Sequence, residues 1–180
     1  THKNKRPLLK TDKFDGFIIG YNSCRPKSLG EVNLSSPYVE DKPVINPNFL
    51  SNDEDIYDVK CAINFSNTLA KTSSIKDIRV DNINNNLIDG SEEEMFEHFK
   101  ENAVSIYHPC GTCKMDKDKS KGVVSERFKV HGLNNLWVLD ASVFPNITSG
   151  NINAPVMMLA NIGSKIITED LKKQSKYENN

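Results

Sequence analysis

The sequence lacks a hydrophobic run long enough to span a membrane, and it lacks an excess of charge of either sign. A membrane-spanning helix needs about 20 mostly apolar residues, and no stretch of the chain approaches this length. The 23 Lys and Arg residues are balanced by 24 Asp and Glu residues, so the net charge is −1. A balanced chain has no general electrostatic attraction for nucleic acid or an anionic membrane. We therefore expect no membrane span and no nucleic-acid partner.

Cysteine is also scarce, with four residues in a chain of 180. So few cysteines at this length argue against a disulfide-rich scaffold. Two of them form the motif Cys110-Gly111-Thr112-Cys113. A zinc site needs four ligands, whereas this motif and His108 offer three, and a redox pair needs a thiol at a helix N-terminus. The third interpretation is two small residues packed in a tight loop, and we predict no metal site.

The sequence begins at Thr1 and shows no signal peptide, so we expect it to be a partial sequence. We expect residues 1–16 to be a tail or the end of a missing segment. N-glycosylation sequons begin at Asn33, Asn64 and Asn146, and they are compatible with export. The expected location is therefore extracellular.

Strands are predicted in the first third of the chain. Phe17 to Tyr21 is a short apolar run, which indicates a strand. Apolar and polar residues alternate from Glu31 to Ser35, which predicts a half-buried strand. The segment from Pro37 to Pro47 contains three prolines, and we expect an extended connection because proline disfavours helix at the preceding residue.

Two helices are predicted from capping residues and from the helical spacing of apolar side chains. Ser51 or Asn52 precedes three acidic residues, which is typical of a helix start, and the apolar spacing extends this helix over 53–70. The sequence from Ser91 to Glu94 fits the capping-box pattern and predicts a second helix over about 91–103.

The last third of the chain combines short apolar segments with one long helix. The segments 122–124 and 128–130 flank a polar turn. Leu136 to Leu139 is fully apolar, which predicts a strand covered on both faces, as in a parallel α/β sheet. Pro155 suits the first turn of a helix, and apolar spacing extends this helix over 155–171. We expect residues 172–180 to be frayed.

His108 is the first candidate for chemistry. An extended segment over 104–107 is expected to deliver it to a loop rich in turn residues. Imidazole titrates near neutral pH, which suits the removal of a proton from an alcohol. The alternative is a structural histidine that bonds a backbone carbonyl.

Asp140 and the residues before the last helix are the other candidates. Asp140 follows the predicted strand over 136–139, and open α/β sheets bind ligands at this end of their strands. The alternative is an aspartate that initiates a turn. Asn151 and Asn153 are each candidates to cap the last helix, whose first turn would attract an anion or an electron-rich ring.

These pieces share an order and spacing that are specific as a set. The motifs are Tyr107-His108-Pro109-x-Gly111-Thr112-Cys113-Lys114-Met115, Val138-x-Asp140-Ala141-Ser142 and Ser149-Gly150-Asn151-x-Asn153-Ala154-Pro155, with Arg25-Pro26-Lys27-Ser28-x-Gly30 and Ile45-Asn46-Pro47-Asn48-Phe49-Leu50 upstream. Together they resemble the C-terminal region of glucose–methanol–choline (GMC) flavoprotein oxidoreductases. The likeness covers about residues 20–170 and is greatest to the insect glucose dehydrogenase-like members.

The resemblance implies a mixed fold that is α+β in one part and α/β in the other. Residues 17–106 would form a substrate-binding domain with an antiparallel sheet and flanking helices. Residues 107–171 would form the active-site loop and the last strand and helix of a Rossmann-like FAD-binding domain. The chain would then be part of a larger protein.

The resemblance also implies an activity and a role for each candidate residue. Members of the family oxidise CH–OH groups of alcohols or sugars and pass a hydride to N5 of FAD. His108 matches the proton acceptor, and Asn153 matches a residue that orients the substrate oxygen. The residues that match FAD contacts are Asp140 and Ala141 on the ribityl–pyrophosphate side, and Asn153, Ala154 and Pro155 at the pyrimidine edge.

A further absence qualifies this resemblance. The sequence has no Gly-x-Gly-x-x-Gly fingerprint, which holds the ADP half of FAD. We therefore expect a missing N-terminal FAD-binding segment to be a partner of this chain, and we expect the chain alone to be inactive. The alternative is a truncated, flavin-free paralogue that acts as a non-catalytic binding protein.

Overall fold

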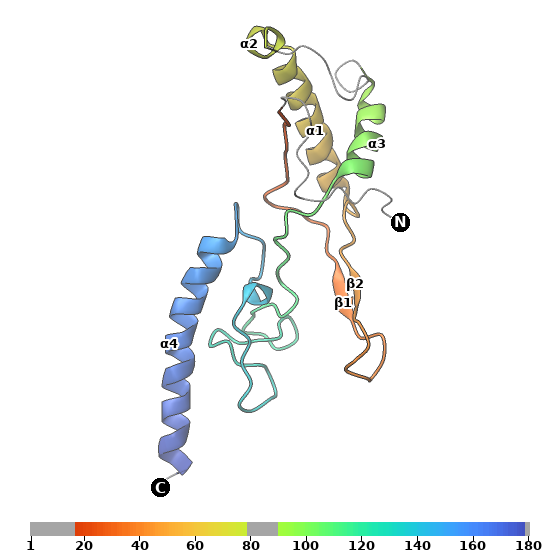
Figure 1. Cartoon of the computed structure of the whole chain (residues 1–180). Coiled ribbons are helices and arrows are strands. Elements are labelled where there is room, and N and C mark those ends of the chain that lie inside the picture. The colour runs from red at the N-terminus through yellow and green to blue at the C-terminus, as the bar shows by residue number, and fades with distance from the viewer. Residues whose placement is uncertain (1–16, 79–89, 179–180) are drawn as a thin grey trace.

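The computed structural model describes residues 17–78 and 90–178 (Figure 1). The elements within these residues are β1 (Glu31–Asn33), β2 (Val44–Asn46), α1 (Asp53–Ala70), α2 (Ser73–Lys76), α3 (Glu92–Asn102), the 3₁₀ helix η1 (Ala141–Val143) and α4 (Asn153–Glu178). We call residues 17–78 and 90–103 the helical unit and residues 107–178 the signature unit. Figure 1 shows α1, α2 and α3 together at one end, and α4 beside the long irregular loop that precedes it.

The bounds predicted for the first long helix are confirmed. Asn52 is its N-cap, and the Asn52 side-chain oxygen accepts a hydrogen bond from the Glu54 N–H at 2.9 Å. The acidic residues of the first turn complement the positive end of the helix dipole. Val59 and Ile63 are buried on one side of α1, because they lie four residues apart and so share a face.

The capping box predicted for α3 is also confirmed. The Ser91 Oγ accepts from the Glu94 N–H, and the Glu94 carboxylate accepts from the Ser91 N–H at 2.8 Å. Met95 and Phe96 are buried against Val59 and Ile63 of α1 and form the first hydrophobic core with them. The predicted helix over 91–103 is thus observed, with its last residue at Asn102.

The segment from Phe17 to Tyr21 is not a strand in the structure. Ile18 is 84% exposed, whereas the Tyr21 ring stacks on Phe99 of α3 with 5.4 Å between centroids. Burial raises the pKa of Tyr21 to about 12. The prediction of a strand was wrong because no described segment pairs with this one, and a strand requires a hydrogen-bonded neighbour.

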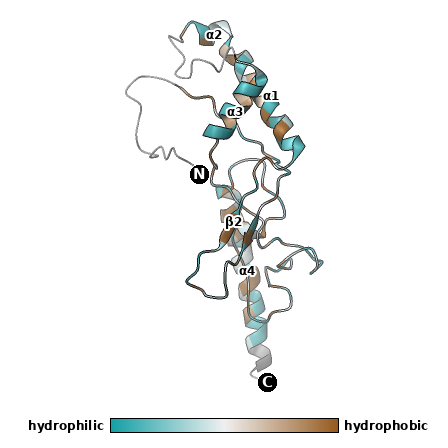
Figure 2. Ribbon diagram, turned by 90° about the vertical axis from the view of Figure 1, so that its right-hand side faces the viewer, coloured by the Kyte–Doolittle hydropathy of each residue, from teal (hydrophilic) through white to brown (hydrophobic). Residues whose placement is uncertain are grey.

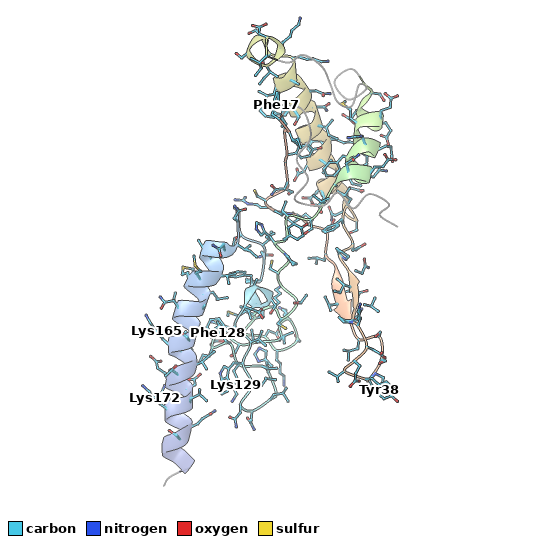
Figure 3. All side chains as sticks on the ribbon, viewed as in Figure 1. Phe17, Tyr38, Phe128, Lys129, Lys165 and Lys172 are labelled. Carbon is cyan, nitrogen blue, oxygen red and sulfur yellow. The ribbon has the colours of Figure 1, made fainter. Side chains whose placement is uncertain are left out.

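The strand predicted over 31–35 is present as β1 but is not half-buried. It pairs antiparallel with β2, with Val32 opposite Ile45, so the expected extended connection over 37–47 contains a strand. Val32 is 49% exposed and Ile45 is 66% exposed. The prediction of burial was wrong because no other element among the described residues covers either face of this two-stranded hairpin. Figure 3 shows Tyr38 at the far tip of this hairpin.

The signature unit has a second hydrophobic core that contains few regular elements. Val124, Phe128 and Val143 are buried there, and Leu159, Ile166 and Ile167 of α4 pack against them. Phe128 lies between the loop and α4, whereas Lys165 and Lys172 point away from the loop (Figure 3). Gly163 of α4 is buried, and a side chain at this position would collide with Leu139. The loop and helix are therefore in close contact.

The strand predicted over 136–139 is replaced by a single bridge. Trp137 pairs antiparallel with Lys129, and Val124 pairs with Val130, so the segments flanking the predicted polar turn do meet. Leu136 is 46% exposed. The prediction of a strand in a parallel layer was wrong for the described chain, because no parallel strand lies beside it there.

α4 is longer than predicted at both ends. It begins at Asn153 and continues to Glu178, so the expected helix over 155–171 is present and residues 172–178, expected to be frayed, are helical. Residues 179–180 and the expected tail over 1–16 lie outside the described residues. An ion pair also joins α4 to the loop that precedes it, because Asp170 of α4 accepts a hydrogen bond from Arg127 Nε at 2.9 Å.

Hydrophobic side chains are exposed on the helices and the hairpin. Figure 2 shows hydrophobic residues along β2 and on part of α4. Met157, Met158 and Ile162 of α4 are each about half exposed. Within the described ranges, no helix combines the length and the apolar character that crossing a membrane would require.

Candidate functional site

His108 stands at the entry to the signature unit, directly after a residue in an unusual conformation. The chain leaves α3 at Asn102, and Tyr107 adopts the left-handed region with φ of 61°. The Tyr107 N–H donates to the Ser105 Oγ at 2.9 Å. A non-glycine residue with positive φ is uncommon and is often found at functional sites. The chain therefore changes direction directly before His108.

The His108 side chain is half-buried and has an unsatisfied polar atom. Its Nδ1 is buried and has no hydrogen-bond partner among the described residues. His131 behaves differently, because its Nε2 lies 2.9 Å from the Asp116 carbonyl oxygen. His131 therefore has the structural role that was the alternative for His108. A buried polar atom without a partner is costly, so His108 Nδ1 is suited to a partner outside the described chain.

The loop that carries His108 is fastened to η1 by three backbone hydrogen bonds. The N–H groups of Gly111, Cys113 and Met115 donate to the carbonyl oxygens of Ala141, Ser142 and Val143 at 3.4, 2.9 and 2.9 Å, respectively. Gly111 has φ of 87°, a conformation that glycine adopts without steric cost. Two of the predicted site segments are therefore held side by side.

Asp140 caps η1. Its Oδ1 accepts from the Ser142 N–H at 2.7 Å, so the turn-initiating role is observed. The residue is exposed, and Oδ2 makes no hydrogen bond with any described residue. Asp140 can therefore hold the turn with one oxygen and offer the other to a hydroxyl donor.

Ser142 is a candidate that the sequence did not single out. Its Oγ is buried without a hydrogen-bond partner among the described residues, as is the indole Nε1 of Trp137. Ser142 follows Asp140 in the Asp-Ala-Ser motif, but no sequence signal distinguishes its hydroxyl from an ordinary turn serine. Its unsatisfied hydroxyl appears only when burial is known.

The turn before α4 presents Asn153 and Ala154 to solvent. Gly150 has φ of 143°, and α4 begins directly after Ile152. The first intrahelical hydrogen bond runs from the Val156 N–H to the Ile152 carbonyl at 2.9 Å. The N–H groups of Asn153 and Ala154 precede this bond and are therefore available to an acceptor.

The asparagines of this turn do not cap the helix as the sequence suggested. The side chains of Asn151 and Asn153 are exposed and form no hydrogen bond with any described residue. The reason is register, because Ile152 occupies the cap position and Asn153 is the first helical residue. The Asn153 amide is therefore free to bind another group. Pro155 lies in the first turn, as predicted.

The predicted site residues form two groups, one at the start of η1 and one at the start of α4. Asp140 and Ala141 follow Leu139, which packs at Gly163, whereas Asn153, Ala154 and Pro155 lie at the start of the helix. His108 is joined through its loop to the first group, and no described hydrogen bond joins it to Asn153.

The cysteines of the loop are Cys110 and Cys113. Cys110 and Cys113 are free and partly buried. Burial raises the pKa of the Cys110 thiol, which disfavours the thiolate that metal binding and disulfide exchange require. In the described ranges no cluster of three metal-ligating side chains is found. The backbone of Cys113 instead takes part in the hydrogen bonds to η1.

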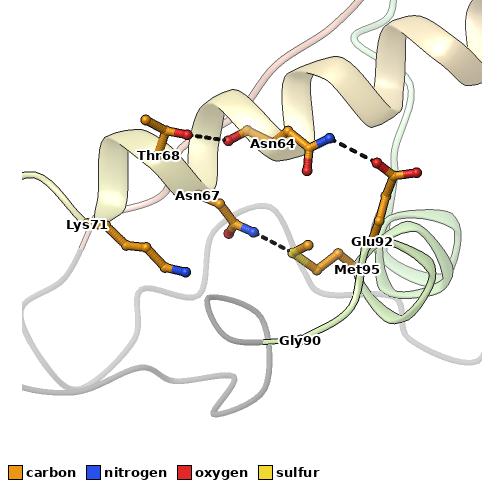
Figure 4. A pocket seen from close by; sticks show the side chains of 7 residues that line it. All are labelled: Asn64, Asn67, Thr68, Lys71, Gly90, Glu92 and Met95. Carbon is orange, nitrogen blue, oxygen red and sulfur yellow. Dashed lines mark hydrogen bonds between the residues drawn. The ribbon is translucent and has the colours of Figure 1, made fainter.

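A polar pocket lies in the helical unit, between α1 and α3 (Figure 4). Its volume is about 430 Å³, and it is lined by Asn64, Asn67, Thr68, Lys71, Gly90, Glu92 and Met95. Asn64 Nδ2 donates to Glu92 Oε2 at 2.9 Å, and Asn67 Nδ2 lies 2.7 Å from the Met95 sulfur. No residue predicted to act in catalysis or cofactor binding lines this pocket.

Comparison with known proteins identifies the family of this chain. Residues 26–160 match the family described as GMC oxidoreductase. The chain is 35% identical over 156 residues to an alcohol dehydrogenase [acceptor] of Pseudomonas putida, covering 84% of this chain and 27% of that protein. It is 32% identical over 159 residues to the mitochondrial choline dehydrogenase of Mus musculus, covering 88% and 27%.

A solved structure agrees with these sequence relatives. A formate oxidase of Aspergillus oryzae RIB40, whose structure concerns modification of its FAD, has a TM-score of 0.75 and 34% sequence identity, covering 83% of this chain and 26% of that one. The chain spans about a quarter of the length of these relatives. The chain belongs to the GMC oxidoreductase family, and residues 26–160 correspond to its C-terminal domain.

Proposed function

We propose that the protein carrying this chain is an FAD-dependent oxidoreductase that acts on the CH–OH group of a small alcohol. The observation that carries the proposal is His108 itself. No described residue forms a hydrogen bond with either ring nitrogen of this histidine, and its loop is bonded to the Asp140 turn. An enzyme that removes a hydroxyl proton needs a base whose nitrogen is not already occupied.

The residues of the signature unit carry polar groups that suit a dinucleotide cofactor. The exposed Asp140 has one oxygen for a hydroxyl, and the start of α4 offers the N–H groups of Asn153 and Ala154 to an electron-rich ring edge. Asp140, Ala141, Asn153, Ala154 and Pro155 are thus the residues that would hold FAD. When bound, FAD would accept the hydride at its N5.

His108 and Asn153 would divide the work on the substrate. The imidazole of His108 would take the hydroxyl proton. The Asn153 amide does not titrate, and it would orient the same oxygen by donating a hydrogen bond. Holding the hydroxyl between two fixed groups reduces the orientational freedom that must be lost on the way to the transition state.

The names of the relatives point to a small alcohol as substrate. Proteins similar to this chain include alcohol and choline dehydrogenases. We propose a primary alcohol as the substrate class. The sugars oxidised by glucose dehydrogenase-like enzymes are a more specific candidate.

We also propose the domain division at residues 106–107, with an N-terminal FAD-binding segment as the partner of this chain. The exposed sequon residues Asn33 and Asn146 are compatible with the extracellular location that we propose.

The experiment is to express the chain together with its upstream coding sequence and to record the absorption spectrum of the purified protein. We expect an oxidised-flavin spectrum that is bleached when a primary alcohol is added without oxygen. A panel of ethanol, benzyl alcohol, choline and glucose then ranks the substrate classes. A protein that binds no flavin would refute the proposal and favour a non-catalytic binding protein.

The 180-residue chain is the matched comparison for that experiment. We expect it to bind no stoichiometric FAD, because the two groups of FAD-contacting residues contain no phosphate-binding glycine loop. Titration of this chain with FAD, followed by flavin fluorescence, measures this directly. Stoichiometric binding would show that the signature unit needs no N-terminal segment.

A further inference from the structure

A side-chain hydrogen bond joins the helical unit to the signature unit. Arg25 Nε of the helical unit donates to the Ser149 Oγ of the signature unit at 3.4 Å. Within residues 17–78 and 90–178, this is the one hydrogen bond that connects the two units. Ser149 opens the turn that leads to Asn153, so the contact lies at the candidate site although Arg25 is 124 residues away in sequence.

Hydrogen bonds on either side of Arg25 attach this segment to α1. The N–H groups of Lys27 and Ser28 donate to the two carboxylate oxygens of Asp55 at 2.8 and 2.7 Å. Asp55 is only 6% exposed. The Ser23 Oγ also donates to the Asp58 carboxylate on α1 at 3.3 Å. The backbone that carries Arg25 is therefore held in position against α1.

The turn that receives Arg25 has little support of its own. Gly150 has φ of 143°, and no atom lies within 4 Å of the position that a Cβ would occupy there. Its internal bonds are short-range, namely the Gly150 N–H to the Thr148 carbonyl at 2.8 Å and the Thr148 Oγ1 to the Gly150 carbonyl at 3.3 Å. A turn bonded only to itself can move as a unit unless an outside group holds it.

We infer that Arg25 is a positioning residue that holds the Ser149–Asn153 turn, and through it the start of α4, in place against the helical unit. This inference rests on the proposed function for its catalytic consequence. Arg25 would not touch the reacting atoms. By fixing the turn, it would keep the Asn153 amide in the position that orients the substrate hydroxyl, and displacements of about 1 Å in such groups can lower rates up to about 100-fold.

The test combines two single variants, their double variant and a charge control in the full protein. Hydrogen exchange is measured at the first turn of α4, where the Val156 N–H bonds the Ile152 carbonyl. We expect Arg25→Ala and Ser149→Ala each to speed this exchange several-fold, and the double variant to add nothing further, as for partners in one contact. Lys27→Ala removes a charge two residues away and should leave exchange unchanged. Unchanged exchange in Arg25→Ala, or additive effects in the double variant, would overturn the inference.

Steady-state kinetics separate this inference from the proposed function. We expect Arg25→Ala and Ser149→Ala to lower kcat about tenfold with flavin content unchanged, and Arg25→Lys to restore part of the loss. If the wild-type protein oxidises no alcohol while exchange at α4 is coupled to Arg25, the proposed function is wrong and the positioning contact stands. If the wild type is active and Arg25→Ala is fully active, the inference fails and the proposed function stands.

Discussion

The helical unit and the signature unit are stabilised in different ways. In the helical unit, α1 and α3 bury Val59, Ile63, Met95 and Phe96 between two capped helices. In the signature unit, Val124, Phe128 and Val143 are buried by a loop that lies on α4, and backbone hydrogen bonds between loop segments replace helix and sheet. The candidate site residues all lie in the second unit. Its irregular backbone brings the loop of His108 beside the turn of Asp140, although the two residues are far apart in sequence.

The first prediction tests whether the two cores are separate. Phe96→Ala and Phe128→Ala should each cost about 3–5 kcal/mol of local stability, because each removes a large buried side chain. Hydrogen exchange should increase in α1 and α3 for the first variant, and in the loop and α4 for the second. Phe65→Ala on α1 is the control, since Phe65 is 69% exposed. If either core variant opened both units equally, the two cores would not be independent.

The second prediction concerns Asp55, the buried charge of the helical unit. Burial alone would raise its pKa, but hydrogen bonds from Ser28 and Lys27 outweigh burial, and the pKa of Asp55 is lowered. Asp55→Asn should cost about 1–3 kcal/mol, because the amide group cannot accept from both N–H groups. Asp53→Asn, at the exposed first residue of α1, should change little. Chemical denaturation at pH 7 measures both variants.

The same residue gives a pH dependence with a definite sign. A lowered pKa in the folded protein means that Asp55 contributes stability above the ordinary aspartate pKa of about 3.9, and that this contribution is lost as pH falls through the lower folded pKa. Wild type should therefore lose stability below about pH 4 more steeply than Asp55→Asn. Parallel curves for the two proteins would show that Asp55 is not selectively stabilised as the anion.

The third prediction tests the irregular backbone of the signature unit. Gly111→Ala should destabilise the loop by about 1–2 kcal/mol, because a Cβ is unfavourable at φ of 87°. Gly20→Ala is the matched control in the helical unit, since no atom lies within 4 Å of a Cβ there. Thermal unfolding of both variants measures the difference. Equal effects would mean that the loop conformation is not a constraint.

The smallest effect is expected at the surface of the signature unit. Arg127 donates to Asp170 through Nε and Nη2, and this contact lowers the pKa of Asp170. The Arg127 side chain is 42% exposed, so water and salt screen the pair. Arg127→Ala should lower the thermal midpoint less than the variants above, and the difference should shrink in high salt. A loss as large as that of Phe128→Ala would mark this pair as part of the core.

The sequence predicted the helical unit better than the signature unit. Capping residues and helical spacing located α1 and α3 because those signals are local. The apolar run over 136–139 also looked like a strand, but strand formation depends on a partner elsewhere, and Trp137 finds only a single bridge. The family motif identified His108 and Asn153 as candidates. The buried Ser142 hydroxyl and the hydrogen bond from Arg25 to Ser149 could be found only from the structure, because a local sequence pattern reports neither burial nor proximity across 124 residues.

The central claim is that His108 is the base of a flavin-dependent alcohol oxidation. The measurement that tests it most directly is the rate of flavin reduction by alcohol without oxygen, in wild type, His108→Ala and the control His98→Ala on α3. We predict a loss of about 10²- to 10⁴-fold in His108→Ala with full flavin occupancy, and no loss in the control. An unchanged rate in His108→Ala, or loss of the flavin from that variant, would contradict the account.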